Sequence, residues 1–269
     1  MEMTFQEYIY NPLGKKSAVF SQRDMYKDLY TKKYGAILLR ENGTFHTELF
    51  QDEKRDRYFI YMRIPSEVVE KFYYDVVVEF YPIEGSNSTD STLNNYGVRF
   101  FSNDPAFVFT YEYVFSKNDL FITELKPRAS KIALRRKPEE RNPYEIPGYV
   151  KSLYFCYLHM KSRSLFNKVH WKHYSKPFRV KELLDKITPS DKKVADRQRL
   201  GEEVQKRKSA EARKKRNEEI ANRQKRNTTI KNAPGNRVKT ITPIQSIKPK
   251  ASTNRLGNNK ATVKTIKKK

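Results

Sequence analysis

The sequence has little of several residue types, and each shortage excludes a class of protein. Cys156 is the one cysteine, so no disulfide can form within the chain, and a reducing, intracellular setting is expected. Nine glycines leave little material for phosphate-cradling loops, and the patterns G-x-x-x-x-G-K-[ST], G-x-G-x-x-G and G-x-S-x-G are all absent. No carboxylate pair has a spacing typical of a metal-dependent nuclease. The sequence therefore predicts a protein that is not an enzyme and that uses no cofactor.

Long apolar runs are also missing. No segment approaches about 18 uninterrupted apolar residues, the length that a membrane-spanning helix requires. The first residues, MEMTF, contain an acid before any base and lead into no apolar stretch, which is not typical of a secretory signal. We expect a soluble protein without a membrane span.

Aromatic residues and acids are unevenly distributed along the chain. All 35 aromatic residues lie at or before Phe178. The formal charge is −5 over residues 1–125, +11 over 126–190 and +18 over 191–269, which together give the net charge of +24. A segment without aromatics and with few apolar residues cannot bury enough surface to offset its ordering entropy. The chain is thus predicted to be a globular region of about 185 residues followed by a basic tail.

Short apolar runs bounded by turn residues predict about six strands with few helices between them. The predicted elements are a hairpin at 35–49 around Asn42-Gly43, strands at 58–64, 75–83, 96–102, 107–115 and 120–125, and a short helix at 66–74 capped by Ser66. This pattern favours an α+β protein whose antiparallel, β-rich N-terminal body is a barrel or a sandwich.

The stretch FVFTYEYVF, residues 107–115, has an aromatic residue at every second position. In a strand these five rings lie on one face, either as core or subunit-interface packing or as a platform for stacking nucleic-acid bases. The surrounding sequence is acidic, and the opposite face would be mixed in character. This favours a half-buried strand over a stacking platform.

The sequence predicts five consecutive regions. They are a β-rich body at 1–125, a proline-rich connector at 126–148, a basic and aromatic helical segment at 149–190 that packs on the body, a charged solvent-exposed helix at 191–227 and a disordered basic tail at 228–269. Within the third region the apolar pattern predicts helices at 149–166 and 178–187. In the fourth, acids precede bases by four residues at Glu202–Lys206, Glu203–Arg207, Glu211–Lys215 and Glu219–Arg223.

The segment 161–181 has no acid and alternates cations with rings, the combination that nucleic acid requires. Its cations are Lys161, Arg163, Lys168, Lys172, Lys176, Arg179 and Lys181, and its rings are Phe166, Trp171, Tyr174 and Phe178. The alternative is a solvated face whose aromatic residues close the core. Trp171 fits either interpretation.

Clusters of Lys and Arg give the strongest indication of function. They are Lys206, Arg207 and Lys208, then Arg213, Lys214, Lys215 and Arg216, and a terminal run of three lysines. Counterion release makes such polycations bind nucleic acid without reading its sequence. The same clusters also suit a nuclear localisation signal or simple solubilisation. An anionic membrane is less well matched because the segment has no apolar face.

Cys156, His159, His170 and His173 have spacings near those of structural zinc sites. The segment between them lacks turn glycines, and the last two lie in a basic stretch. We therefore predict that no metal is bound, with these four residues as the candidates if one is.

One resemblance adds to these predictions. FFSNDPAFVFTYEYVF in a β-rich body, a composition rich in Tyr, Lys and Asn, and a basic tail together resemble small proteins encoded by bacteriophages. The resemblance implies a virion or assembly component that touches packaged genome, or an accessory factor in DNA transactions. It assigns no functional residue.

The sequence as a whole predicts a non-enzymatic, nucleic-acid-associated structural or accessory protein. Its basic C-terminal region is expected to bind the backbone of DNA or RNA, and its body to contact itself or other structural proteins. The alternative is an assembly protein whose basic tail binds an acidic protein partner.

Overall fold

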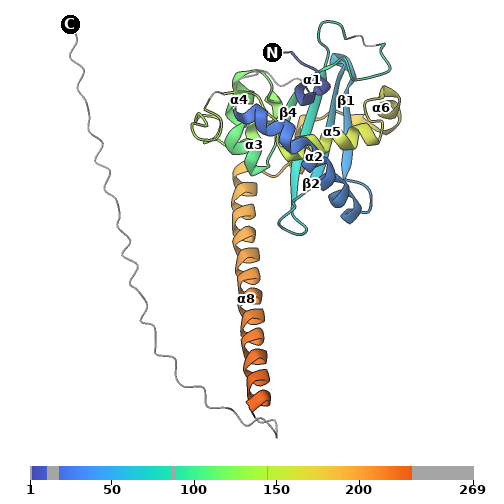
Figure 1. Cartoon of the computed structure of the whole chain (residues 1–269). Coiled ribbons are helices and arrows are strands. Elements are labelled where there is room, and N and C mark those ends of the chain that lie inside the picture. The colour runs from blue at the N-terminus through green and yellow to red at the C-terminus, as the bar shows by residue number, and fades with distance from the viewer. Residues whose placement is uncertain (1, 11–17, 87–88, 144, 232–269) are drawn as a thin grey trace, which may run out of the picture. The chain divides into compact units, whose positions relative to one another are not determined.

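The computed structural model describes residues 2–10, 18–86, 89–143 and 145–231, and for residues 18–28 and 226–231 it describes the backbone alone. The chain divides into two units, Met1–Arg213 and Lys214–Lys269. The first unit contains a sheet and the helices that cover its two faces (Figure 1).

The sheet is open and mostly antiparallel. Its strands are β1 (Thr47–Asp52), β2 (Arg57–Pro65), β3 (Tyr73–Tyr81), β4 (Gly97–Ser102) and β5 (Lys176–Pro177). They are arranged in the order β4-β3-β2-β1-β5, and the short β5 alone pairs in parallel. The prediction of a mixed α+β protein with an antiparallel sheet is confirmed, whereas a closed barrel or a two-sheet sandwich is not.

The central strands are buried on both faces, which agrees with their nearly continuous apolar runs. In β3, every residue from Tyr74 to Tyr81 is buried. Short segments cover the outer edge of β4, where the backbone N–H of Val98 donates to Met3 O at 3.0 Å and that of Phe100 to Leu120 O at 2.8 Å. This pairing satisfies an edge that would otherwise be open to another strand.

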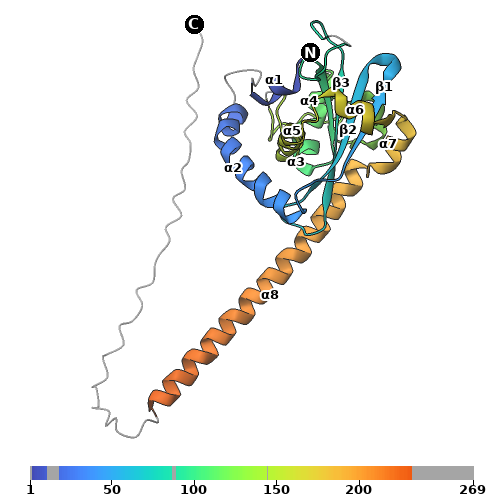
Figure 2. The same cartoon turned by 90° about the vertical axis from the view of Figure 1, so that its right-hand side faces the viewer.

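The helices are distributed over both faces of the sheet. They are α1 (Phe5–Tyr10), α2 (Ala18–Arg40), α3 (Pro105–Thr110), α4 (Glu112–Lys117), α5 (Lys151–Ser162), α6 (Lys168–Tyr174), α7 (Val180–Lys186) and α8 (Ser190–Lys231), with 3-10 turns η1 (Glu53–Arg55) and η2 (Thr123–Arg128). Figure 2 shows α5 between α2 and the sheet. On the opposite face η2 contacts α7, and Phe178 stacks on Phe59 of β2 with ring centroids 3.8 Å apart.

The aromatic stretch 107–115 is helical, so the strand prediction for it is wrong. Asp104 caps α3 by accepting a hydrogen bond from the N–H of Ala106 at 3.0 Å, and Pro105 occupies the first turn, where it is well tolerated. A ring at every second position is also a ring at every fourth, which is one face of a helix. Phe107, Tyr111 and Phe115 accordingly lie in the core, and Phe109 is 45% exposed.

Asn42 and Gly43 end helix α2 and do not form the predicted hairpin. Both have positive φ, 55° and 81°, as the prediction required. The N–H of Gly43 donates to Leu38 O at 2.8 Å and that of Asn42 to Leu39 O at 3.2 Å, the two bonds of a Schellman motif. The positive φ values agree with the prediction, but residues 35–40 form part of a helix rather than a strand.

Two further short elements differ from their predictions. Residues 66–72 form turns, in which the Ser66 hydroxyl accepts from the N–H groups of Val68 and Val69 at 3.3 Å each, and no helix follows. Residues 120–125 provide a single bridge from Phe121 to β4 and then enter η2. The conformation of both segments depends on tertiary contacts, which the local sequence pattern does not predict.

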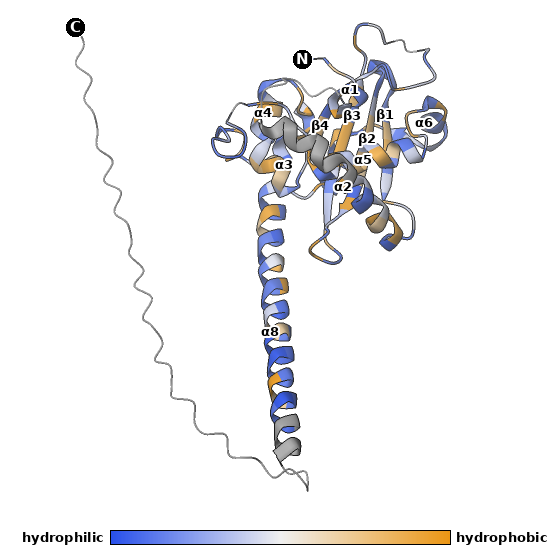
Figure 3. Ribbon diagram, viewed as in Figure 1, coloured by the Kyte–Doolittle hydropathy of each residue, from blue (hydrophilic) through white to orange (hydrophobic). Residues whose placement is uncertain are grey.

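Helix α8 includes the predicted helix 191–227 and continues to Lys231. Figure 3 shows that most of its residues are hydrophilic, in contrast to the apolar central strands. The predicted tail lies outside the described residues from position 232 onward. The predicted region boundaries at 125, 148 and 190 stay predictions.

Candidate nucleic-acid interface

Helix α6 has a buried face and an exposed one. It begins after Asn167, whose side chain accepts from the N–H of Val169 at 2.9 Å. Trp171 is fully buried, donates its indole N–H to Leu165 O at 2.8 Å and packs edge-on against Tyr58 with ring centroids 5.4 Å apart. Trp171 is therefore a core residue, and its ring is not accessible to a nucleic-acid base.

Lys168 also faces inward. Its ammonium donates to the Tyr96 hydroxyl at 2.6 Å and lies 4.3 Å from the centre of that ring, and the residue is 5% exposed. Burial lowers the pKa of Lys168. Lys168 and Trp171, both predicted as nucleic-acid contacts, are therefore buried within the protein.

The outer face of α6 and the residues after it form an exposed group of cations and rings. We define the α6 patch as Lys172, His173, Tyr174, Lys176 and Arg179, all of which are exposed. Tyr174 is 72% exposed, and its ring stacks at 24° against that of His170, with centroids 6.5 Å apart. An exposed ring beside cations is the arrangement that stacks a base while phosphates are neutralised.

The cations of the α6 patch are not equally available. Lys176 pairs with Glu48 at 2.8 Å, and Lys186 pairs with the same carboxylate at 3.1 Å. Burial alone would raise the pKa of Glu48, but hydrogen bonds from Lys176, Lys186 and His46 lower it to about 2. Lys172 and Arg179 form no ion pair within the described residues and are the freer charges.

Lys161 and Arg163 lie at the C-terminal end of α5, and both are exposed. The Arg163 guanidinium donates to the carbonyl of Gly43 at the end of α2. Lys161 lines a polar cavity of about 580 Å³ together with Gln6 and Tyr10. These two cations therefore contact different neighbours from those of the α6 patch.

The α8 clusters are exposed throughout the part of the helix whose side chains are described. Every side chain from Gln205 to Lys225 is exposed, and this range contains all seven predicted cations, namely Lys206, Arg207, Lys208, Arg213, Lys214, Lys215 and Arg216. None of the four predicted Glu–Lys or Glu–Arg pairs forms an ion pair. The positive charge of these residues is thus not neutralised by neighbouring acids.

The start of α8, in contrast, packs against strand β3 within the first unit. Lys193 donates to Tyr73 O at 2.8 Å and lies 3.7 Å from Asp75, and Arg197 donates to the Tyr74 hydroxyl at 3.1 Å. These contacts satisfy polar groups at the end of the sheet.

The four candidate metal ligands are not brought together. Cys156 is fully buried, and burial raises the pKa of its thiol. His159 stacks on Phe45, and burial together with the Arg163 charge lowers its pKa to about 4. His170 and His173 lie on α6 beside Tyr174. Within the described ranges no group of three His, Cys, Asp or Glu side chains has a metal-binding arrangement.

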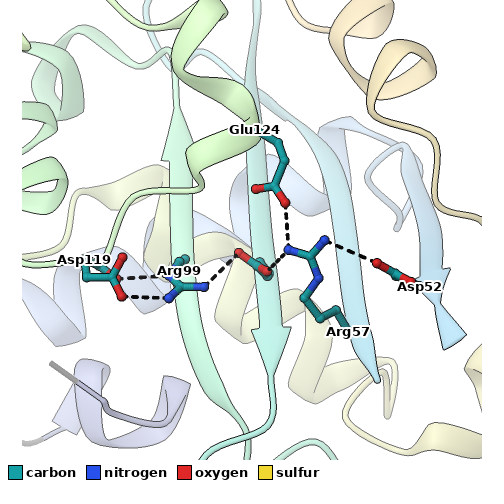
Figure 4. A network of polar contacts seen from close by, with 6 residues as sticks. Asp52, Arg57, Arg99, Asp119 and Glu124 are labelled. Atoms are coloured by element: carbon teal, nitrogen blue, oxygen red, sulfur yellow. Dashed lines mark hydrogen bonds and ion pairs between the residues drawn. The ribbon is translucent and has the colours of Figure 1, made fainter. Parts of the chain in front are cut away.

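Sequence reasoning did not identify a charged network on the sheet face that η2 covers (Figure 4). Arg57 donates to Glu79 at 2.9 Å, to Glu124 at 2.7 Å and to Asp52 at 3.2 Å. Arg99 lies 3.8 Å from the same Glu79, which is fully buried. The sequence did contain one indication of this network, because Glu79 is a charged residue inside the apolar run DVVVEFY, residues 75–81. Because the charges pair with one another, we interpret the network as structural.

Comparisons with protein families, with curated proteins and with solved structures find no match to this chain. Among the described residues, no helix combines the length and the apolar character needed to cross a membrane.

Proposed function

We propose that this protein binds the sugar-phosphate backbone of DNA or RNA through helix α8, as a non-enzymatic structural or accessory protein. The observation that carries this proposal is the run from Lys206 to Arg216, where seven exposed cations accompany one acid, Glu211. Cations that no acid neutralises release counterions from a polyanion when they meet its phosphates. Such contacts position a protein on nucleic acid without specifying sequence.

The α6 patch supports the same function in a different way. Tyr174 presents an exposed ring, and Lys172 and Arg179 carry exposed charges close to it in sequence. We propose that this patch adds stacking to single-stranded segments. The β-rich body then contacts other copies or other structural proteins, as in a phage virion or assembly component.

A salt titration tests this proposal. The variant replaces the seven cations between Lys206 and Arg216 with glutamine, a good helix former, and keeps residues 217–269. If all seven meet phosphates on duplex DNA, the slope of log K against log salt becomes shallower by about 6. The measurement is fluorescence anisotropy with unrelated DNA and RNA oligonucleotides.

A matched variant changes seven exposed, uncharged residues of α8 to glutamine, and it should bind as the original protein does because its charge is the same; these residues are Ser209, Ala210, Ala212, Asn217, Ile220, Ala221 and Asn222. A slope that is identical in the seven-cation variant contradicts the proposal. Binding to polyglutamate that exceeds binding to both nucleic acids at equal charge favours the alternative, an assembly protein that recognises an acidic partner.

A further inference from the structure

A cavity of about 550 Å³ lies within the first unit, where α2, α3, α5, the turn at 66–68 and the start of α8 meet. Its volume is within the range of small-ligand sites, about 300–1,000 Å³. The cavity is lined by four cations, several tyrosine rings and two carboxylates. None of these residues belongs to the α6 patch or to the α8 cation clusters.

Two lysines converge on one side of the cavity. Lys33 of α2 and Lys151 at the start of α5 both contact the same oxygen of Glu67, at 3.3 and 2.6 Å. One carboxylate thus holds two ammonium groups together and neutralises one of them. Val150, which precedes α5, provides no side-chain cap for this helix.

Two arginines supply further positive charge. Arg197 of α8 donates its Nε–H to the Tyr74 hydroxyl at 3.1 Å, and its two terminal amino groups have no hydrogen-bond partner among the described residues. Arg141 lines the same cavity from the loop after η2. The second lining acid, Asp104, is 7% exposed and already accepts the N–H of Ala106, and burial raises its pKa. The lining therefore has an excess of available cationic donors.

The remaining walls are largely apolar. Tyr30, which is partly exposed, contributes a ring, and Leu29 and Val68, which are 42% and 49% exposed, add aliphatic surface; Tyr111 and Tyr149 line the cavity as buried residues. A ligand that fits these walls has a planar, largely apolar part and an anionic part. The combination of ring stacking and charge-assisted hydrogen bonds to phosphate is how proteins recognise nucleotides.

We propose that this cavity binds a nucleotide, with the base on the wall formed by Tyr30, Leu29 and Val68 and the phosphates at Lys33, Lys151 and Arg197. The ligand is either a free nucleotide or the 5′-phosphorylated end of a strand. This site is separate from the backbone-binding surface of the proposed function and does not depend on it.

Isothermal titration calorimetry of the full-length protein tests the site with ADP, with a 5′-phosphorylated dinucleotide, and with adenosine and pyrophosphate as the two halves of the ligand. Arg197→Met and Lys33→Met should each weaken ADP binding by about tenfold or more, because each removes a charged donor. The neighbouring exposed cations Arg199 and Lys32 line no part of this cavity, so Arg199→Met and Lys32→Met should change it by less than about twofold.

A steric variant provides a second test that leaves all charges in place. Ala106 is exposed on α3 and lines the cavity, so Ala106→Trp should abolish ADP binding, while Ala195→Trp on the exposed surface of α8 should not. Binding of ADP or of the phosphorylated dinucleotide with this pattern supports the site, and the tighter of the two identifies the source of the nucleotide.

The proposal is overturned if neither binds, if pyrophosphate or adenosine binds as tightly as ADP, or if the control variants lose binding equally. The seven-cation α8 variant should retain ADP binding, which separates this result from that of the proposed function.

Discussion

Arg57 in strand β2 and Arg207 in helix α8 carry the same guanidinium group in opposite settings. Arg57 has a side chain that is 12% exposed and contacts three carboxylates, from Asp52, Glu79 and Glu124. Arg207 is exposed and forms no ion pair among the described residues. The Arg57 guanidinium stabilises the sheet through these ion pairs, whereas the Arg207 guanidinium is available to bind a ligand. A count of charges along the sequence does not separate these two roles.

The same contrast applies to aromatic residues on one helix. Trp171 and Tyr174 are three positions apart on α6, yet the first is fully buried and the second is 72% exposed. Burial rather than residue type therefore decides which charges and rings can meet a partner. Four predictions test this difference between the interior and the surface.

The largest expected effect comes from the buried ring of α6. Trp171→Ala should lower the free energy of unfolding by about 3–5 kcal/mol, because a large aromatic side chain leaves a cavity in the core. Chemical denaturation monitored by circular dichroism measures this change. Tyr174→Ala is the matched variant and should stay within about 0.5 kcal/mol of the original protein. Equal losses in both variants would contradict the assignment of two distinct faces.

The second prediction concerns a substitution that disrupts the charged network of the sheet. Glu79→Gln should cost about 3 kcal/mol of stability, because it removes the buried carboxylate that pairs with the partly buried guanidiniums of Arg57 and Arg99. Asp52 and Glu124 still pair with Arg57 and limit the loss. Glu211→Gln on α8 provides the comparison and should be nearly neutral. An unchanged denaturation midpoint for Glu79→Gln would show that the network contributes nothing to stability.

The third prediction concerns pH and Glu112 of α4. Burial raises the pKa of this carboxyl to about 8, although the N–H of Ser130, which donates to Glu112 at 2.8 Å, acts to lower it. Between pH 4.5 and about 8 the folded protein keeps a proton that the unfolded chain has released, so stability falls as pH rises through this window. Glu112→Gln should remove this dependence and stabilise the protein at neutral pH by on the order of 3 kcal/mol.

Denaturation at several pH values measures this effect, with Glu203→Gln on α8 as the exposed control. If the slope of stability against pH is the same in Glu112→Gln and in the original protein, the carboxyl is already ionised in the folded state and the prediction fails.

The smallest expected effect is on binding. Tyr174→Ala should weaken single-stranded oligonucleotide binding by about 1–3 kcal/mol, because an exposed ring that stacks on a base is lost. Duplex binding should be unaffected, since paired bases are not available to the ring. Anisotropy titrations with single-stranded and duplex forms of one sequence compare the two. A loss that is equal for both would indicate that the residue acts through the backbone and not by stacking.

Local sequence determined much of this protein. The apolar runs at 58–64, 75–83 and 96–102 are strands, and the amphipathic and charged patterns near α5, α7 and α8 are helices, because each pattern is long enough to favour one periodicity. The chain has no aromatic residue after Phe178, yet Leu183 of α7 and Ile187 directly after it still lie in the core, so loss of aromatic residues and loss of core packing do not coincide.

Tertiary structure decided what short patterns left ambiguous. The rings of 107–115 satisfy both a strand and a helix, and the cap at Asp104 together with packing around Phe107 and Phe115 selects the helix. Which face of α6 is buried depends on contacts with strands more than 100 positions away in sequence, such as that of Trp171 with Tyr58. The cavity cations Lys33, Lys151 and Arg197 come from three separate helices. No spacing in the sequence relates these residues, because long-range burial brings them together.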